Sequence, residues 1–323
     1  AGTIDIANSQ TLTAGNSANT EISGSIAGSG GFTKAGTGIL TLSGTNSYNG
    51  TTTINAGTLK VTGSLSNSTA VNVGSSGTYD VDASDTIASF EGSGTIDIAA
   101  SQTLTAGDSN NKTFSGTISG SGSLIKNGSG ILSLSGNNSF SGGATLNTGV
   151  VQVGHNNALG SGTLTLAGAT LRPDATARSL SQAVSINADT TLGRSGSPAL
   201  TLSGDVTFSS GSVTVSSASN TIMSGAIDLG TGTKTFSVSS GKVQTASGVI
   251  SNGSLTKSGD GRMNLTGDST YTGTTLVSAG ELRLQSGSSI DSTTVNVTGS
   301  GKLYLESTNA LVSSANITLT GAS

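Results

Sequence analysis

Three segments of the chain repeat one pattern without a gap, and this repetition constrains the fold more than any other feature. The segments are 30–61, 122–153 and 253–284. Glycines fall in register in all three copies, and so do apolar positions, which in the first copy are Leu40, Leu42, Ile54, Leu59 and Val61. Internal self-similarity of this kind is typical of repeat architectures, in which each unit buries its apolar face against its neighbours.

The spacing inside one copy predicts strands. Leu40 and Leu42 lie two residues apart, as do Leu59 and Val61, so each pair shares one face of a strand. The stretches "SGTNSYNG" and "NAG" separate the pairs, and glycine is favoured where a strand must turn sharply. We interpret one copy as three short strands around one coil of a β-solenoid.

The copies are displaced by 92 (122 − 30) and 131 (253 − 122) residues. These offsets are close to four and six times about 22, which predicts an all-β parallel β-helix of about 15 coils. We expect one continuous solenoid over 1–323, with an irregular stretch near 172–182. An antiparallel sandwich is the alternative, because it also uses short alternating strands.

Composition removes several classes of function. The chain has no Cys, so it has no disulfide framework and no thiolate metal site. The net charge is −4, without the basic stripe that nucleic-acid binding requires. No apolar run approaches the roughly 18 residues of a membrane span.

The segment 36–61, "GTGILTLSGTNSYNGTTTINAGTLKV", and its two copies resemble the autotransporter-associated β-strand repeat of bacterial type V secreted proteins. This repeat occurs in their passenger regions. The resemblance implies a right-handed parallel β-helix that is extracellular or attached to the cell surface, often as an adhesin stalk. It implies no catalytic residues.

We therefore expect a structural or adhesive bacterial protein, an adhesin stalk or matrix scaffold, and not an enzyme. The expected partners are glycans or proteins of host or neighbouring cells, with no nucleic acid. Attachment to the outer membrane is expected through a region outside this sequence. Because both ends of the sequence are strand-like, head-to-tail stacking into a filament is a further hypothesis.

Few residues are candidates for chemistry, and we expect no catalytic, cofactor-binding or metal-ligating residues. The only histidine, His155, is expected at a solvated corner. Asp80, Asp82 and Asp85 are the densest carboxylates. They are expected on a solvated strand face, with Asp80 and Asp82 opposite Tyr79; a Ca²⁺ site is the alternative.

The alternative function is a carbohydrate-active enzyme, a polysaccharide lyase or hydrolase. Such chemistry requires acids on one face, or acids beside a basic group. Arg172, Asp174 and Arg178 form the nearest mixed cluster.

Two further sets of residues recur at equivalent positions of the three copies. Tyr48, Phe140 and Tyr271 are expected to fill their own corners, with a sugar-stacking stripe as the alternative. Lys34, Lys126 and Lys257 are expected to point outward and keep a strand-rich surface soluble, with specific anion binding as the alternative.

Overall fold

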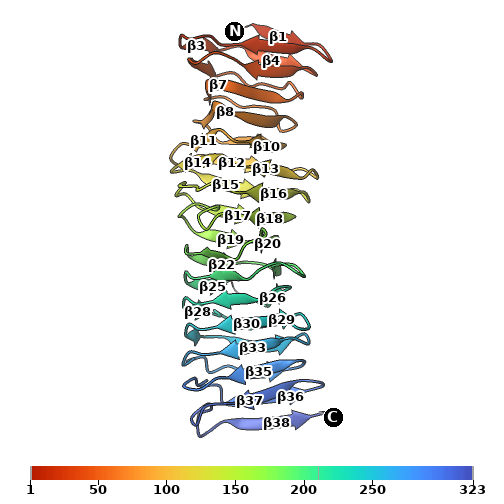
Figure 1. The fold of residues 1–323 in the computed structure, drawn as a ribbon, viewed down its shortest axis with the longest axis vertical. Coiled ribbons are helices and arrows are strands. Elements are labelled where there is room, and N and C mark those ends of the chain that lie inside the picture. Colours follow the sequence, from red (N-terminus) through yellow and green to blue (C-terminus); the bar gives the residue numbers. More distant parts are fainter. Residues whose placement is uncertain (1, 210, 322–323) are drawn as a thin grey trace. The chain divides into compact units, whose positions relative to one another are not determined.

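The computed structural model describes residues 2–209 and 211–321. Over these residues the regular structure consists of strands, and no helix occurs. The chain divides into two compact units, Ala1–Gly162 and Thr163–Ser323, and each is described by itself. Within each unit, parallel pairing joins strands of successive turns, so that the strands lie one above the other (Figure 1).

The first unit has three faces. One contains β1 (Thr3–Ile6), β4 (Ser25–Gly28), β9 (Asp85–Ile87), β12 (Thr103–Ala106), β15 (Ser123–Lys126) and β17 (Ala144–Leu146). The second contains β2 (Thr11–Ala14), β5 (Gly31–Lys34), β10 (Ser89–Gly92), β13 (Lys112–Phe114), β16 (Ile131–Leu134) and β18 (Val150–Val153). The third contains β3 (Thr20–Ile22), β6 (Ile39–Leu42), β11 (Thr95–Ile98) and β14 (Thr117–Gly120). Two long strands, β7 (Thr52–Val61) and β8 (Ala70–Val81), pair on both the second and the third face.

The second unit also has three faces. One contains β19 (Leu164–Leu166), β22 (Val184–Ile186), β25 (Val206–Phe208), β28 (Ile227–Asp228) and β31 (Ile250–Ser251). The second contains β20 (Thr170–Pro173), β23 (Thr190–Leu192), β26 (Val213–Ser217), β29 (Thr233–Val238), β32 (Ser254–Ser258), β34 (Thr275–Val277), β36 (Thr294–Thr298) and β38 (Asn316–Thr320). The third contains β21 (Arg178–Leu180), β24 (Leu200–Leu202), β27 (Thr221–Met223), β30 (Val243–Ala246), β33 (Arg262–Leu265), β35 (Glu281–Leu284) and β37 (Lys302–Leu305).

These pairings confirm the predicted parallel β-solenoid. Residues 2–209 and 211–321 make about 16 turns. Turn length varies, since paired residues on successive turns are 19 positions apart at Thr52 and Val71 (71 − 52) and 25 apart at Thr190 and Val215 (215 − 190). The right-handed twist of the coil and its continuity over 1–323 stay predictions.

The interpretation of segment 36–61 as one coil is wrong. Leu40 pairs with Leu59 and Leu42 with Val61, so the first and last strands of the segment lie on successive turns of one face. The segment exceeds one turn because this part of the chain closes a turn in 19 residues (59 − 40). All four side chains still point inward and are buried, as the alternation predicted.

The offset of 92 residues is also not a whole number of turns. Four steps of pairing lead from Leu12 through Phe32, Thr52 and Val71 to Phe90. Leu124, which lies 92 residues after Phe32 and holds the equivalent position of the second copy, pairs instead with Leu104 on another face. The first two copies are therefore rotated from each other by one face. A repeat tolerates this rotation because each face offers the same parallel ladder and the same inward positions.

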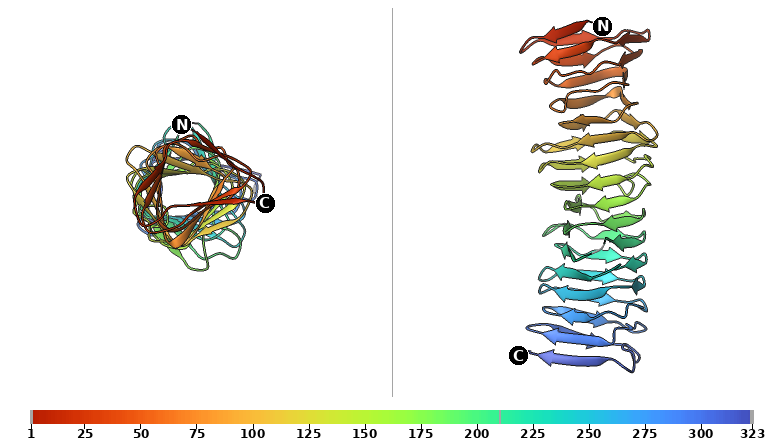
Figure 2. Two further views of the ribbon diagram at one scale, coloured as in Figure 1. Left: turned by 90° about the horizontal axis from the view of Figure 1, so that it is seen from above. Right: turned by 180° about the vertical axis from the view of Figure 1, so that it is seen from behind.

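The interior is filled by side chains that alternate inward along most of the strands, as in β11 and β15. Figure 2 shows, within each unit, the successive turns that carry these strands. Rings pack between turns, with centroids 5.9 Å apart for Phe32 and Tyr48 and 5.4 Å apart for Phe90 and Phe114. In the second unit, Phe208 and Phe236 are 5.9 Å apart. Among residues 2–209 and 211–321, no helix has the length and apolarity that a membrane span requires.

Candidate functional site

The corner aromatics of the three copies are buried, as expected. Tyr48, Phe140 and Tyr271 each have 0% exposure, so none is available to stack on a sugar. The Tyr48 hydroxyl shares a hydrogen bond of 2.7 Å with Thr52 Oγ1, and Tyr271 shares one of 2.8 Å with Thr275 Oγ1. The second copy has Ala144 where the other copies have these threonines, so both hydrogen-bonding groups are replaced together.

The expectation that the recurring lysines point outward is wrong. Lys34, Lys126 and Lys257 have exposures of 0%, 3% and 0%, and their side chains point into the solenoid. Lys34 Nζ donates to the carbonyls of Ala35 and Gly36 at 2.8 Å and of Ala56 at 2.9 Å. Main-chain carbonyls thus replace the water that an outward ammonium would bind.

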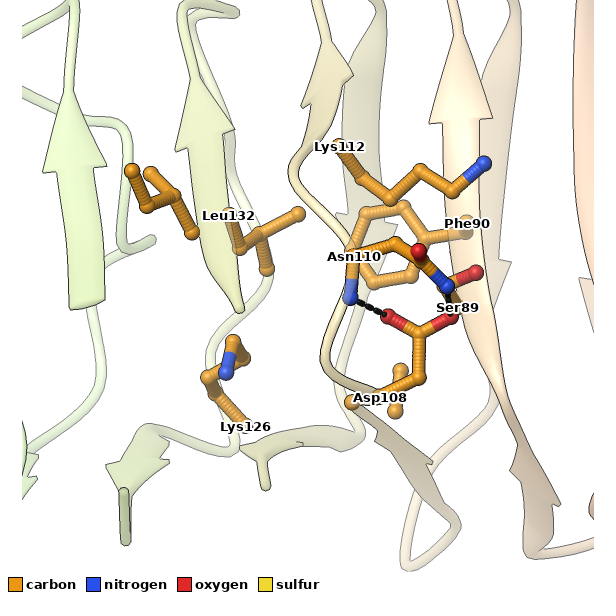
Figure 3. A pocket seen from close by; sticks show the side chains of 10 residues that line it. Ser89, Phe90, Asp108, Asn110, Lys112, Lys126 and Leu132 are labelled. Atoms are coloured by element: carbon orange, nitrogen blue, oxygen red, sulfur yellow. Dashed lines mark hydrogen bonds between the residues drawn. The ribbon is translucent and has the colours of Figure 1, made fainter. Parts of the chain in front are cut away.

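A cavity of about 10 Å³ lies beside Lys126. Figure 3 shows Phe90, Asp108, Asn110 and Leu132 around it, with the Asp108 carboxylate accepting hydrogen bonds from Asn110. This volume is about that of one water molecule, so the cavity is too small for an organic substrate.

Asp80 lies on the outer side of β8, opposite the buried Tyr79, as the alternation predicted, and Asp82 directly follows the end of this strand. Lys60 Nζ forms ion pairs with both, at 3.4 Å from Asp80 Oδ2 and in closer contact with Asp82 Oδ2. The burial of Asp80 and its closeness to Asp82 raise the pKa of Asp80, while Lys60 opposes this shift. The ammonium therefore occupies the position between the two carboxylates that a cation would take.

Asp85 differs from the other two carboxylates, and our grouping of the three on one solvated face is wrong for it. Its side chain is 3% exposed and accepts hydrogen bonds from the Leu65 amide at 3.1 Å and the Tyr79 hydroxyl at 2.7 Å. Burial raises the pKa of Asp85 to about 6, although the hydrogen bonds from Tyr79, Leu65 and Thr86 act in the opposite direction.

Asp85 belongs to a set of corner side chains that satisfy main-chain amides of the preceding turn. Asn46 Oδ1 accepts from the Ile26 amide at 3.0 Å, and Asn138 Oδ1 accepts from the Ile118 amide at 2.8 Å. The sequence carries a signal for this role, because Asn46 and Asn138 occupy the same position of the repeat. Sequence reasoning missed it because Asp85 lies outside the three copies.

The mixed cluster of the second unit is a strand corner. Residues 174–177 connect β20 and β21. Arg178 contacts Asp174 through two bonds, Nε to Oδ1 at 3.1 Å and Nη2 to Oδ2 at 2.8 Å. The hydrogen bond from Arg178 lowers the pKa of Asp174, and the Thr176 amide contributes further. The Asp174 carboxylate therefore stabilises the corner to which it belongs. Arg172 is affected separately, because its burial and the nearby positive charge of Arg194 lower its pKa.

His155 lies in a turn after β18, where its Nδ1 accepts a hydrogen bond from the Asn157 amide at 3.0 Å. Of the residues that the structure describes, no group of three or more His, Cys, Asp or Glu side chains is arranged to hold a metal ion. The polar side chains thus mainly hold corners and connect turns.

A scan against family models matches residues 32–61, 124–153 and 255–284 to the passenger-associated-transport-repeat. These segments coincide with the three copies, which confirms their resemblance to autotransporter passenger repeats. The search of curated proteins and the search of solved structures found no match. The repeats and the β-solenoid fit an autotransporter passenger-type structural protein, secreted or at the cell surface.

Proposed function

We propose that this chain is the stalk of an adhesin or a scaffold of the extracellular matrix, that it carries out no catalysis, and that it binds glycans or proteins of other cells. The observation that supports this proposal most is the use of the buried polar groups. Lys34, Asn46 and Asp85 all hydrogen-bond to main-chain groups at corners, and such contacts hold turns together.

The test is surface display followed by a binding assay. The chain, joined to a surface anchor, should increase attachment of bacteria to host or neighbouring cells over bacteria that display the anchor alone. Unchanged attachment to a panel of cells and matrix glycans would contradict the adhesive role. If displayed chains hold the bacterial surface farther from the target cell than the anchor alone does, without increasing the number of attached bacteria, the role is that of a stalk.

Head-to-tail self-association is the narrower form of this proposal. In β38 the apolar Ile317 and Leu319 are 44% and 68% exposed, and a second copy of the chain would cover them. Electron microscopy of the purified chain at high concentration should show filaments, and Leu319→Ser should shorten them. Monomers alone at high concentration would contradict the filament.

The carbohydrate-active enzyme remains the competing proposal. Its test is a turnover screen on common polysaccharides with the wild type, Arg172→Ala and Asp174→Ala. Turnover that either substitution abolishes would overturn the structural proposal.

A further inference from the structure

The three copies of the repeat contain the same arrangement of main-chain oxygens around a lysine ammonium. In each copy the lysine contacts the carbonyls of the next two residues and one carbonyl of the following turn. Lys126 Nζ lies 2.5 Å from the Asn127 oxygen, 2.8 Å from that of Gly128 and 3.4 Å from that of Thr148. Lys257 Nζ lies 2.6, 2.7 and 3.1 Å from the oxygens of Ser258, Gly259 and Ala279.

We call the three main-chain carbonyls around each of these lysines a carbonyl cage. Glycines create these carbonyl cages. The second cage residue is a glycine with φ of +69° to +71° in the first two copies, at Gly36 and Gly128. The residue after the third cage carbonyl is also a glycine, with φ of +65° at Gly57 and +73° at Gly149. Glycine reaches these left-handed corners without strain, and at them the carbonyls lie within hydrogen-bonding distance of the lysine ammonium.

Three inward carbonyls suit a cation that has lost its water. An ammonium has three N–H donors, which matches the three oxygens of each cage. Main-chain carbonyls also replace the hydration shell of K⁺ in ion channels, so carbonyl oxygens are ligands that suit a monovalent cation as well as an ammonium. A buried charge without such partners is strongly destabilising.

A related arrangement occurs in the second unit outside the matched segments. Lys234 is fully buried, and its Nζ donates to the Thr231 carbonyl at 2.6 Å and to that of Gly211 at a shorter distance. The Phe208 ring lies 6.0 Å from this ammonium, where a cation–π contact replaces the third carbonyl. The recurrence shows that inward carbonyls and an ammonium form together at more than one kind of corner.

We propose that each matched segment contains a monovalent-cation site made of main-chain carbonyls, for which the lysine ammonium is a tethered ligand. A free ammonium or potassium ion replaces the lysine when its side chain is removed. The bound charge joins two turns, because two of the oxygens belong to one turn and the third belongs to the next. This assignment is independent of the adhesive role.

Thermal unfolding of Lys257→Ala tests the proposal in chloride salts of ammonium, potassium and tetramethylammonium at one ionic strength. Ammonium and potassium should raise the midpoint by ~2–4 °C over tetramethylammonium, which has no N–H donor and is too large for the cage. The wild type and Lys302→Ala, an outward lysine, should show no such difference. Equal midpoints of Lys257→Ala in the three salts, or an equal response of the wild type, would overturn the proposal.

A second measurement applies if Lys257→Ala does not fold. In a ¹H–¹⁵N spectrum of the wild type at neutral pH, the ammonium protons of Lys34, Lys126 and Lys257 should be visible, because three accepted hydrogen bonds slow their exchange with water. Those of Lys302 should exchange too fast to be seen. If the three ammonium signals are absent from the wild-type spectrum, or if Lys257→Met unfolds at the same midpoint as the wild type, the carbonyls need no cation.

Discussion

The hydroxyl groups of Tyr271 and Thr275 lie 2.8 Å apart in the interior of the second unit, where both side chains are fully buried. At the equivalent positions of the second copy the chain has Phe140 and Ala144. A buried hydroxyl is stabilising when its partner is present and costly when it is alone, so the pair is retained or lost as a unit.

Tyr271→Phe should therefore lower the free energy of unfolding by ~1–3 kcal/mol, because it leaves Thr275 Oγ1 buried without this partner. Adding Thr275→Ala should restore part of the loss, since the double variant reproduces the pair found in the second copy. A double-mutant cycle by urea unfolding measures the coupling. Additive effects of the two substitutions would contradict the pairing.

Stability should depend on pH through Asp85. The folded-state pKa of about 6 lies above the ordinary value of 3.8, so the folded chain binds more protons between these pH values. The free energy of unfolding should fall as pH rises from about 3 to 7, by ~3 kcal/mol from this group, with most of the fall between about pH 4 and 6. Asp85→Asn should remove that fall, which urea unfolding at several pH values detects.

The control for Asp85 is Asp82→Asn, which removes an outward carboxylate of the same strand region. This variant should keep the decline between pH 4 and 6. If Asp85→Asn leaves the decline in the free energy of unfolding unchanged, other groups cause that decline.

Gly128→Ala should destabilise the first unit strongly. The residue has φ of +71°, and an added Cβ would lie 2.3 Å from the Asp108 carbonyl oxygen. Gly241 is the matched control, because its φ is +70° and a Cβ there meets nothing within 4 Å. Gly241→Ala should cost ~1–2 kcal/mol from backbone strain, and Gly128→Ala ~1–3 kcal/mol more from the contact. Equal losses in thermal unfolding would exclude the steric contribution.

Lys60→Ala should change stability by only ~0–1 kcal/mol, because its ion pairs with Asp80 and Asp82 are partly exposed to solvent. The difference from the wild type should shrink at high salt, which screens exposed charges. Urea unfolding at two salt concentrations measures it. A large loss that salt does not reduce would place this lysine with the buried ones.

The fold was predictable because glycine corners and two-residue alternation are local signals. Leu40, Leu42, Leu59 and Val61 are buried as their spacing indicates. Which strands lie on one turn was not predictable, because turns vary in length and the faces are equivalent. The orientation of the three repeat lysines was predicted wrongly for a related reason. A charged side chain is expected on the outside unless the inward carbonyls that bind it are known. Lys34 is the clearest example.

The rotation of the second copy relative to the first affects how the first unit presents its surface. Two equivalent epitopes on the repeats would point in different directions around the axis, because the equivalent residues Phe32 and Leu124 belong to different faces. A flat partner would then touch one epitope at a time, whereas several separate partners would each reach one. In the proposed adhesive role, duplication in this unit would therefore present the epitopes to several separate partners and not to one flat surface.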